Sequence, residues 1–199
     1  MFEIVENFEN QIADFYGAPY AVATDSCTHA IELCLRYKKI KAATCPTHTY
    51  ISIPFTFEKL NINWKWERIN WKDFYFIGNT NIVDAAVLWK ENSYIQNTLM
   101  CLSFQYKKHL SLGRGGMILC DKKEEKDELR KMSYDGRDLS KPWRKQNIST
   151  IGYHYYMTPE TAEQGITKLE SAKIDQPKKH WSWRDYPDLS KMEVFNEIH

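Results

Sequence analysis

Short apolar stretches with strand character alternate with amphipathic helical stretches along most of this 199-residue chain. Apolar residues recur at helical spacing from Phe2 to Phe15, and Gly17 follows as a helix terminator. Strands are expected at residues 20–24, 42–45, 62–69, 75–77, 82–85, 98–104 and 117–120, and further helices at 28–37, 51–60, 121–132 and 159–169. This alternation predicts an α/β domain with a mostly parallel sheet flanked by helices.

The amino-acid composition argues against several classes of protein. The formal net charge of +1 gives no reason to expect nucleic acid or an anionic membrane as the main partner. No apolar run approaches the roughly 20 residues that a membrane helix needs, and the N-terminus lacks the charged-then-apolar order of a signal peptide. The five cysteines include no Cys-x-x-Cys pair, so we expect them to be reduced, buried thiols of a cytoplasmic protein.

The C-terminal part of the chain differs from the rest. Many Trp and Tyr residues fall between Trp143 and Tyr186, and the chain after Ile174 is polar, aromatic and Pro-containing. We therefore expect one α/β domain over residues 1–171 and an extended tail over residues 172–199. The late aromatic residues suggest burial against a second subunit, and packing within the monomer core is the alternative.

The segment from Cys101 to Gly116 carries the clearest chemical signal. Lys108 stands between an apolar strand and a glycine-rich turn, and the Ser103 hydroxyl precedes it by five positions. This arrangement suits a cofactor held covalently through an amine, although most lysines are solvated surface charges. A free lysine amine has a pKa of about 10.4, so partial burial and cationic neighbours are needed for a neutral nucleophile. Lys107, His109 and Arg114 are the candidate neighbours.

Two further positions suit an anionic cofactor. Asp25 to Thr28 falls where a strand turns into a helix, so Thr28 and the N–H groups after Cys27 could hold a phosphate; an ordinary helix cap is the alternative. Asp84 closes a strand, where ligands meet the carboxyl ends of strands in open α/β sheets. Its alternative role is a helix N-cap for the residues that follow.

Five ordered motifs resemble the DegT/DnrJ/EryC1/StrS sugar aminotransferase family. They are Thr24–Leu33, Pro46–Tyr50, Asn81–Ala86, the Ser103–Gly116 segment with Lys108 and Gly-Arg-Gly-Gly, and Gly152–Thr158. The resemblance covers about Phe8 to Leu169. It implies the large domain of a pyridoxal phosphate (PLP)-dependent transferase of fold type I, in reduced form and with the small C-terminal domain largely absent.

The resemblance also implies a role for each matching residue. Lys108, rather than Lys107, would carry PLP as a Schiff base and act in catalysis together with Asp84, which would face the pyridine nitrogen. Cys27, Thr28 and Ser103 would hold the phosphate, and a strand-end hydroxyl satisfied by backbone is the alternative for Ser103. Tyr50 would stack on the cofactor ring, with a core tyrosine as the alternative, and Thr49 is expected to cap backbone. His154 stands where the family has an Asn that reaches the phosphate of a neighbouring subunit.

The chain also departs from the family pattern. Family members are roughly twice as long, and the usual strand-helix-strand crossover is missing between Leu60 and Asp84. Val87 stands where the family has Gln or His, and Tyr156 replaces an Arg beside His154. His154 and Tyr156 change the residues expected to contact a partner subunit and to recognise the amino donor, whereas the other departures concern the scaffold and the tuning of the cofactor.

The resemblance implies an aminotransferase that moves an amino group from an amino acid, most plausibly glutamate, to a keto group of a nucleotide-linked sugar. It also implies a homodimer with shared active sites. The alternative is a degenerate homologue that serves as a non-catalytic binding or dimerisation module. A third class, PLP enzymes that dehydrate sugars, normally replaces the lysine with histidine, so Lys108 argues against it.

Overall fold

The computed structural model describes residues 2–196 and has an α/β fold. Its helices are α1 (Glu3–Tyr16), α2 (Cys27–Tyr37), α3 (Ser52–Lys59), α4 (Lys123–Ser133) and α5 (Pro159–Ile174). Its strands are β1 (Tyr20–Thr24), β2 (Ala42–Pro46), β3 (Asn63–Glu67), β4 (Tyr75–Phe76), β5 (Ile82–Asp84), β6 (Leu99–Ser103) and β7 (Gly116–Cys120). Each of these elements overlaps an element that the sequence predicts, and the expected α/β class is confirmed.

The main sheet has the strand order β1-β7-β6-β5-β4 and is mixed, which corrects the expectation of a mostly parallel sheet. Only β5 and β6 pair in parallel within it, whereas β1–β7, β6–β7 and β4–β5 are antiparallel. The connections explain the difference, because a chain that returns directly from one strand to its neighbour must pair with it antiparallel. Neither the loop between β6 and β7 nor the turn between β4 and β5 contains a helix. A second sheet holds only β2 and β3, which pair in parallel.

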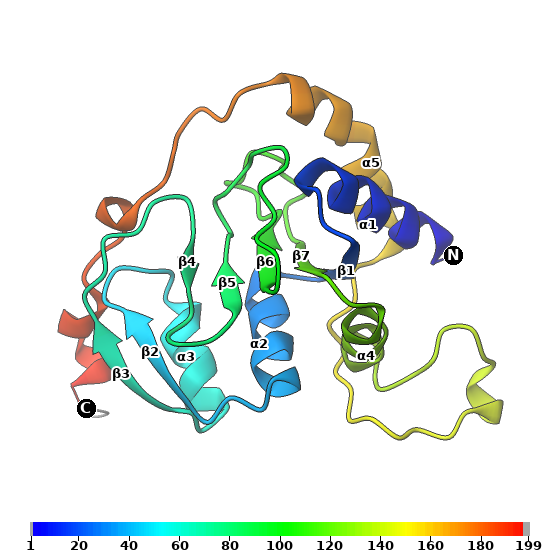
Figure 1. The fold of residues 1–199 in the computed structure, drawn as a ribbon, viewed down its shortest axis with the longest axis horizontal. Coiled ribbons are helices and arrows are strands. Elements are labelled where there is room, and N and C mark those ends of the chain that lie inside the picture. The colour runs from blue at the N-terminus through cyan, green and yellow to red at the C-terminus, as the bar shows by residue number, and fades with distance from the viewer. Residues whose placement is uncertain (1, 197–199) are drawn as a thin grey trace.

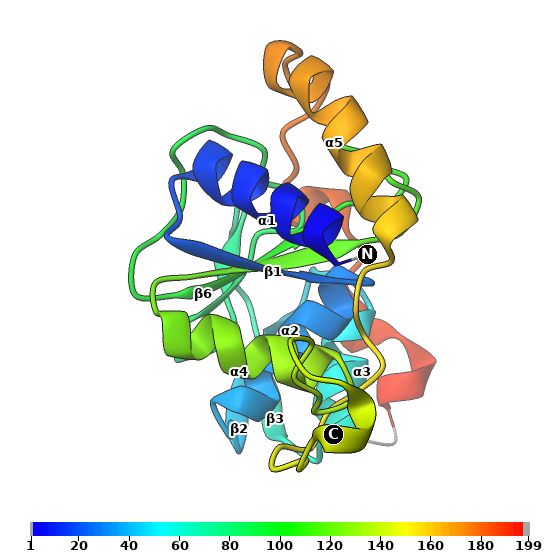
Figure 2. The ribbon, with the colours of Figure 1, turned by 90° about the vertical axis from the view of Figure 1, so that its right-hand side faces the viewer.

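Helices cover both faces of the main sheet. Figure 2 shows α1 and α5 on one side of the sheet and α2 and α4 on the other. Two apolar clusters fill the spaces between these layers: one includes Phe8, Phe104 and Leu169, and the other includes Ile31 and Ile118. Burial of this kind stabilises the fold by roughly 25 cal/mol per Å² of apolar surface.

Glu9 of α1 links this helix to β1 and to α4 on the other side of the sheet (Figure 2). Its side chain is only 1% exposed and accepts a hydrogen bond of 2.7 Å from the Ala23 N–H of β1. It also forms an ion pair with Arg130 of α4. A buried carboxylate with two partners on different elements fixes their relative positions, since loss of either partner would leave a buried polar group unsatisfied.

Helix α5 extends to Ile174, so the tail begins at residue 175 rather than at the predicted residue 172, and its described part, residues 175–196, crosses the molecule. In Figure 1 it leaves α5, arches over the end of the main sheet and descends beside β3. Backbone hydrogen bonds attach it to the body, from Asp73 N–H to Trp181 O (2.8 Å) and from Leu189 N–H to Thr47 O (2.8 Å). Trp183 and Tyr186 of the tail pack against an apolar cluster of this chain. This agrees with the alternative that the late aromatic residues pack within the monomer.

Two expectations from composition concern the cysteines and membrane-spanning helices. All five cysteines are free and buried, which confirms the prediction of buried thiols. Among the described residues, no helix has the length and apolar character needed to cross a membrane.

Candidate active site

A cavity of about 410 Å³ lies where β5 and β6 end and α2 begins. It is lined by six of the seven predicted site residues: Cys27, Thr28, Tyr50, Asp84, Ser103 and Lys108. These residues come from α2, β5, β6 and the loops that follow β2 and β6. The structure thus gathers side chains that are up to 81 positions apart in the sequence into one site.

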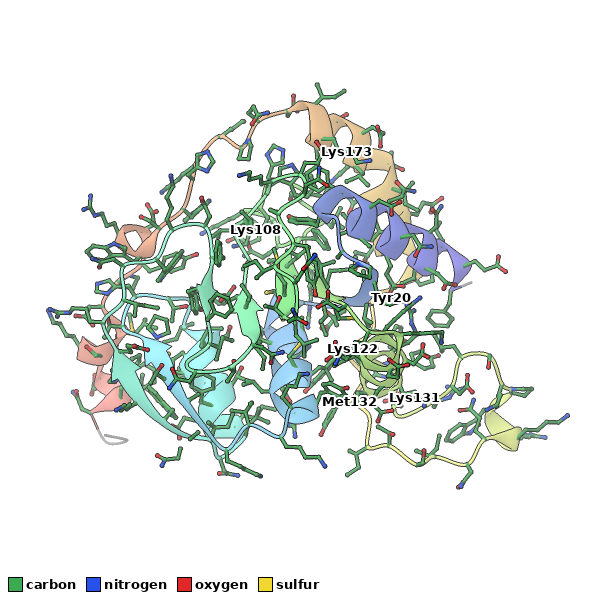
Figure 3. The ribbon with its side chains drawn as sticks, viewed as in Figure 1. Tyr20, Lys108, Lys122, Lys131, Met132 and Lys173 are labelled. Carbon is green, nitrogen blue, oxygen red and sulfur yellow. The ribbon has the colours of Figure 1, made fainter. Side chains whose placement is uncertain are left out.

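Lys108 lies in the loop between β6 and β7, near the ends of β5 and β6 and beneath the arch of the tail (Figure 3). The loop is held by hydrogen bonds from Phe104 N–H to Gly115 O (2.9 Å) and from Lys108 N–H to Gln105 O (2.8 Å). The Lys108 side chain is half-buried, and its amine lies 5.9 Å from the ring centroid of Trp181. Within residues 2–196, this amine has neither a hydrogen bond nor an ion pair, so it is available to a ligand.

Burial lowers the pKa of Lys108, and the nearby charge of Lys107 lowers it further. Cys27 and Asp84 act in the opposite direction and raise this pKa. Of the three cationic neighbours expected from the sequence, Lys107 contributes in this way, whereas Arg114 is paired with Asp25 at 2.7 Å. Lys107 itself is exposed, with its amine 5.5 Å from the Tyr106 ring centroid. The environment that favours a neutral amine therefore belongs to Lys108.

Asp84 ends β5 and is 7% exposed. Its carboxylate accepts hydrogen bonds from the Tyr75 hydroxyl (2.6 Å) and from the Ala86 N–H (3.0 Å). Burial raises the pKa of Asp84, and these two hydrogen bonds together with the Lys108 charge oppose that effect. The helix-cap alternative is wrong, because residues 85–98 form turns and loop rather than a helix.

Sequence reasoning missed the groups that hold Asp84. Tyr75 lies directly opposite Asp84 in the antiparallel β4–β5 register, and its hydroxyl also contacts Thr49 Oγ1 at 2.5 Å. Thr49 is thus a buried partner of Tyr75, which corrects the expectation that it caps backbone. Only the strand pairing reveals this chain of hydroxyls, and the sequence carries no local signal for it.

The start of α2 forms a cup of hydrogen-bond donors. Ser26 is the helix N-cap and accepts from the His29 N–H at 3.2 Å, so Thr28 is not needed for capping. The Thr28 and Ser52 hydroxyl oxygens lie 2.9 Å apart. Ser103 and Arg114 complete the lining on this side of the cavity. A helix N-terminus with hydroxyls and a guanidinium nearby attracts a phosphate.

Gly116 allows the glycine-rich turn to approach this cup. A Cβ at Gly116 would lie 2.4 Å from the Ser26 carbonyl carbon and 2.5 Å from the Cys27 nitrogen. Both contacts are with backbone, which cannot rotate away. The last glycine of the Gly-Arg-Gly-Gly turn therefore has a packing role at the phosphate cup.

Tyr50 and Cys27, two other predicted site residues, differ in how far they are exposed. The Tyr50 ring lines the cavity and is 56% exposed, so the core alternative for it is wrong. Cys27 is buried in the cavity wall, and burial raises the pKa of its thiol well above the ordinary value.

His154 lies outside the cavity. Its side chain is 71% exposed and its Nδ1 is 2.9 Å from Asp135 Oδ2. The role expected for His154 concerns the phosphate of a second chain, so it stays a prediction.

The tail supplies part of the cavity wall that the sequence analysis did not identify. Trp181, Asp185 and Tyr186 all line it. The composition of the tail indicated only that it lies against some surface, and the structure shows that this surface includes the Lys108 cavity.

Comparisons with known proteins decide the family. The model of the DegT/DnrJ/EryC1/StrS aminotransferase family matches residues 1–59 and 95–191. This chain belongs to that family. The matched residues include the strand and loop that carry Lys108, whereas Asp84 falls in the unmatched stretch, so its assignment rests on geometry. A comparison with curated proteins finds no match.

Solved structures show the same fold. AtS13 from Actinomadura melliaura is 16% identical, with a TM-score of 0.73 and coverage of 86% of this chain and 60% of that chain. A 3-amino-5-hydroxybenzoic acid (AHBA) synthase is 18% identical, with a TM-score of 0.72 and coverage of 86% and 56%. The sugar aminotransferase CalS13 from Micromonospora echinospora is 12% identical, with a TM-score of 0.71 and coverage of 86% and 61%. This chain therefore spans about three fifths of the length of these proteins.

The family is PLP-dependent, and the cavity has the chemical groups that this cofactor requires. The Lys108 amine suits the aldehyde, the buried Asp84 carboxylate suits the pyridine nitrogen, and the donors at the start of α2 suit the phosphate. The residues present thus fit PLP.

Proposed function

We propose that this chain is a PLP-dependent aminotransferase that moves an amino group from an amino acid to the keto group of a nucleotide-linked sugar. The observation that carries the proposal is the position of the Lys108 amine, which is half-buried and faces the same cavity as the buried Asp84. Glutamate as the donor and a sugar as the acceptor rest on family analogy alone.

Each group in the cavity has a task in this proposal. Thr28, Ser103 and the N–H groups after Cys27 would bind the cofactor phosphate, and the Tyr50 ring would stack on the cofactor ring. Asp84 would pair with the pyridine nitrogen and keep it protonated. When bound, PLP supplies an electron sink that makes the substrate Cα–H acidic.

Lys108 would perform two steps. Its lowered pKa increases the neutral fraction of the amine, which is the form that attaches the cofactor. Once released by the incoming amino donor, the same Nζ would take the proton from the substrate Cα and return it to the cofactor carbon. Trp181 and Tyr186 would limit the access of water from the tail side.

A non-catalytic role is the second candidate, favoured by two observations. The chain spans about three fifths of its structural neighbours and has His154 and Tyr156 in place of the Asn and Arg that the family uses near the partner's site. In that case the chain would bind PLP or a partner subunit without transferring an amino group.

The two candidate functions predict different results for the first half-reaction, in which an amino donor passes its amino group to the cofactor. Purified protein saturated with PLP is mixed with L-glutamate, and 2-oxoglutarate is quantified together with the cofactor absorbance. The proposal predicts about one 2-oxoglutarate per bound PLP, and none from Lys108→Ala. Lys122→Gln, which removes a remote charge at the start of α4, serves as the control. PLP binding without formation of the corresponding 2-oxo acid from glutamate or from any of several other amino acids would support the second candidate.

A further inference from the structure

A second cavity adjoins the Lys108 cavity. Its volume is about 600 Å³, and it shares Lys107, Lys108 and Trp181 with the first. Its walls come from residues 86–89, from the loop after β6 and from residues 175–179 and Trp181 of the tail. A ligand in this space would lie beside Lys108, which lines both cavities.

The second cavity is strongly basic. Four lysines line it, Lys107, Lys108, Lys178 and Lys179, against one carboxylate, Asp175. Lys179 is compensated by an ion pair with Asp185 at 2.6 Å. Lys107 and Lys178 form no ion pair within residues 2–196, so their charge is available to a ligand.

Hydrogen bonds fix the walls of this cavity. His109 Nε2 lies 2.9 Å from the Ala172 carbonyl oxygen, and the Trp89 Nε1–H donates to the same oxygen at 3.0 Å. These contacts join the loop that carries Lys107 and the segment after β5 to the end of α5. The bond from Asp73 N–H to Trp181 O then holds the tail on the far side. The tail thus brings Lys178 to the same cavity as Lys107.

We propose that the second cavity is an anion subsite that binds a phosphate or carboxylate group of the substrate whose reacting carbon lies at Lys108. Lys107 and Lys178 supply the charge, and Trp89 and Trp181 supply apolar walls for the adjoining part of the substrate. The identification of this ligand as a substrate rests on the proposed aminotransferase function, whereas anion binding in the cavity does not.

The test measures anion binding directly. Inorganic pyrophosphate and glutarate are titrated by calorimetry, at low salt, into the full chain with PLP in excess so that the cup at α2 is filled. The dissociation constant should rise about fivefold or more in Lys107→Gln/Lys178→Gln. The matched control, Lys122→Gln/Lys145→Gln, removes the same charge from exposed positions outside both cavities and should leave binding unchanged.

The outcomes separate the possible sources of the anion. Tighter binding of pyrophosphate points to a substrate phosphate, and tighter binding of glutarate points to the carboxylate of the amino donor; both support the subsite. Binding of neither anion, or equal weakening by both double variants, overturns it. Anion binding that depends on Lys107 and Lys178 in a protein that fails to take up PLP would keep the subsite and refute the proposed function.

Discussion

At the scale of single residues, the site combines an amine and a carboxylate that are both perturbed by burial. Burial lowers the pKa of Lys108 and raises that of Asp84, so each group moves toward its neutral form. Such pairs of perturbed groups in one cavity are typical of functional sites. A cation beside Asp84, such as a protonated pyridine nitrogen, would lower its pKa and favour the charged carboxylate.

Lys107 should tune the reactivity of its neighbour. Its positive charge lowers the pKa of Lys108, so Lys107→Gln should raise that pKa and move the onset of PLP attachment to higher pH. The rate of attachment, followed by absorbance from pH 6 to 10, measures this shift. Lys122→Gln carries the same change of charge and should keep the wild-type profile. A profile for Lys107→Gln that is unmoved, or moved to lower pH, would contradict the assignment.

Asp84 should control reactivity more than cofactor occupancy. Asp84→Asn keeps the size of the side chain but removes the negative charge expected at the pyridine nitrogen, while the cup at α2 still holds the phosphate. The half-reaction with an amino donor should slow by about 10²-fold or more, with the bound cofactor still visible in the spectrum. If the variant reacts at the wild-type rate, Asp84 has only a structural role.

At the scale of elements, the close approach of β7 to the start of α2 positions the phosphate cup. Gly116 begins β7 in contact with the backbone of Ser26 and Cys27. Any side chain at this position must displace α2, β7 or both. The geometry of the cup therefore depends on a glycine that does not itself touch the ligand.

A pair of glycine substitutions tests this dependence. Gly116→Ala should lower the free energy of unfolding by about 2–3 kcal/mol, because the new Cβ meets backbone on two sides, and it should weaken PLP binding. Gly113→Ala meets no atom within 4 Å and should cost only about 1 kcal/mol for its positive φ of 78°. Urea unfolding and PLP titration measure both effects. Equal PLP affinities in the two variants would show that Gly116 does not position the phosphate cup.

Local sequence patterns predicted the elements because helices and strands follow local periodicity. The helix over residues 2–17 and the strand over residues 20–24 appear almost as expected, as α1 and β1. Strand direction was less predictable, since β7 is antiparallel only because the loop with Lys108 returns directly from β6. The predicted ends of two strands identified Asp84 and Ser103 as candidate site residues. The Tyr75–Thr49 contact and the part of the cavity wall that the tail forms depend on contacts between distant residues, which local patterns do not reveal.

At the scale of the whole molecule, the tail and a projecting loop are the notable features. The tail closes one side of the Lys108 cavity with residues of the same chain. The segment from Gly136 to Ile151 projects away from the sheet (Figure 1) and exposes large apolar side chains, including Trp143 at 58% and Ile151 at 79%. Apolar side chains exposed on a projecting loop are suited to an interface with a second copy of the chain.

We expect a homodimer in which His154 reaches the phosphate of the partner's cofactor. Light scattering at micromolar concentration should give the mass of two chains, and His154→Ala should weaken PLP binding without changing that mass. A monomer with PLP fully bound would refute the shared site. A dimer in which His154→Ala leaves PLP affinity unchanged would keep the assembly but remove His154 from the site.

Borohydride reduction tests most directly whether Lys108 holds the cofactor. The protein is incubated with PLP, reduced, digested and mapped by mass spectrometry, with Lys108→Ala treated in parallel. We expect one reduced PLP adduct on the Lys108 nitrogen and none at this site in the variant. An adduct that maps to Lys107, or a protein that gains no adduct under saturating PLP, would contradict this expectation.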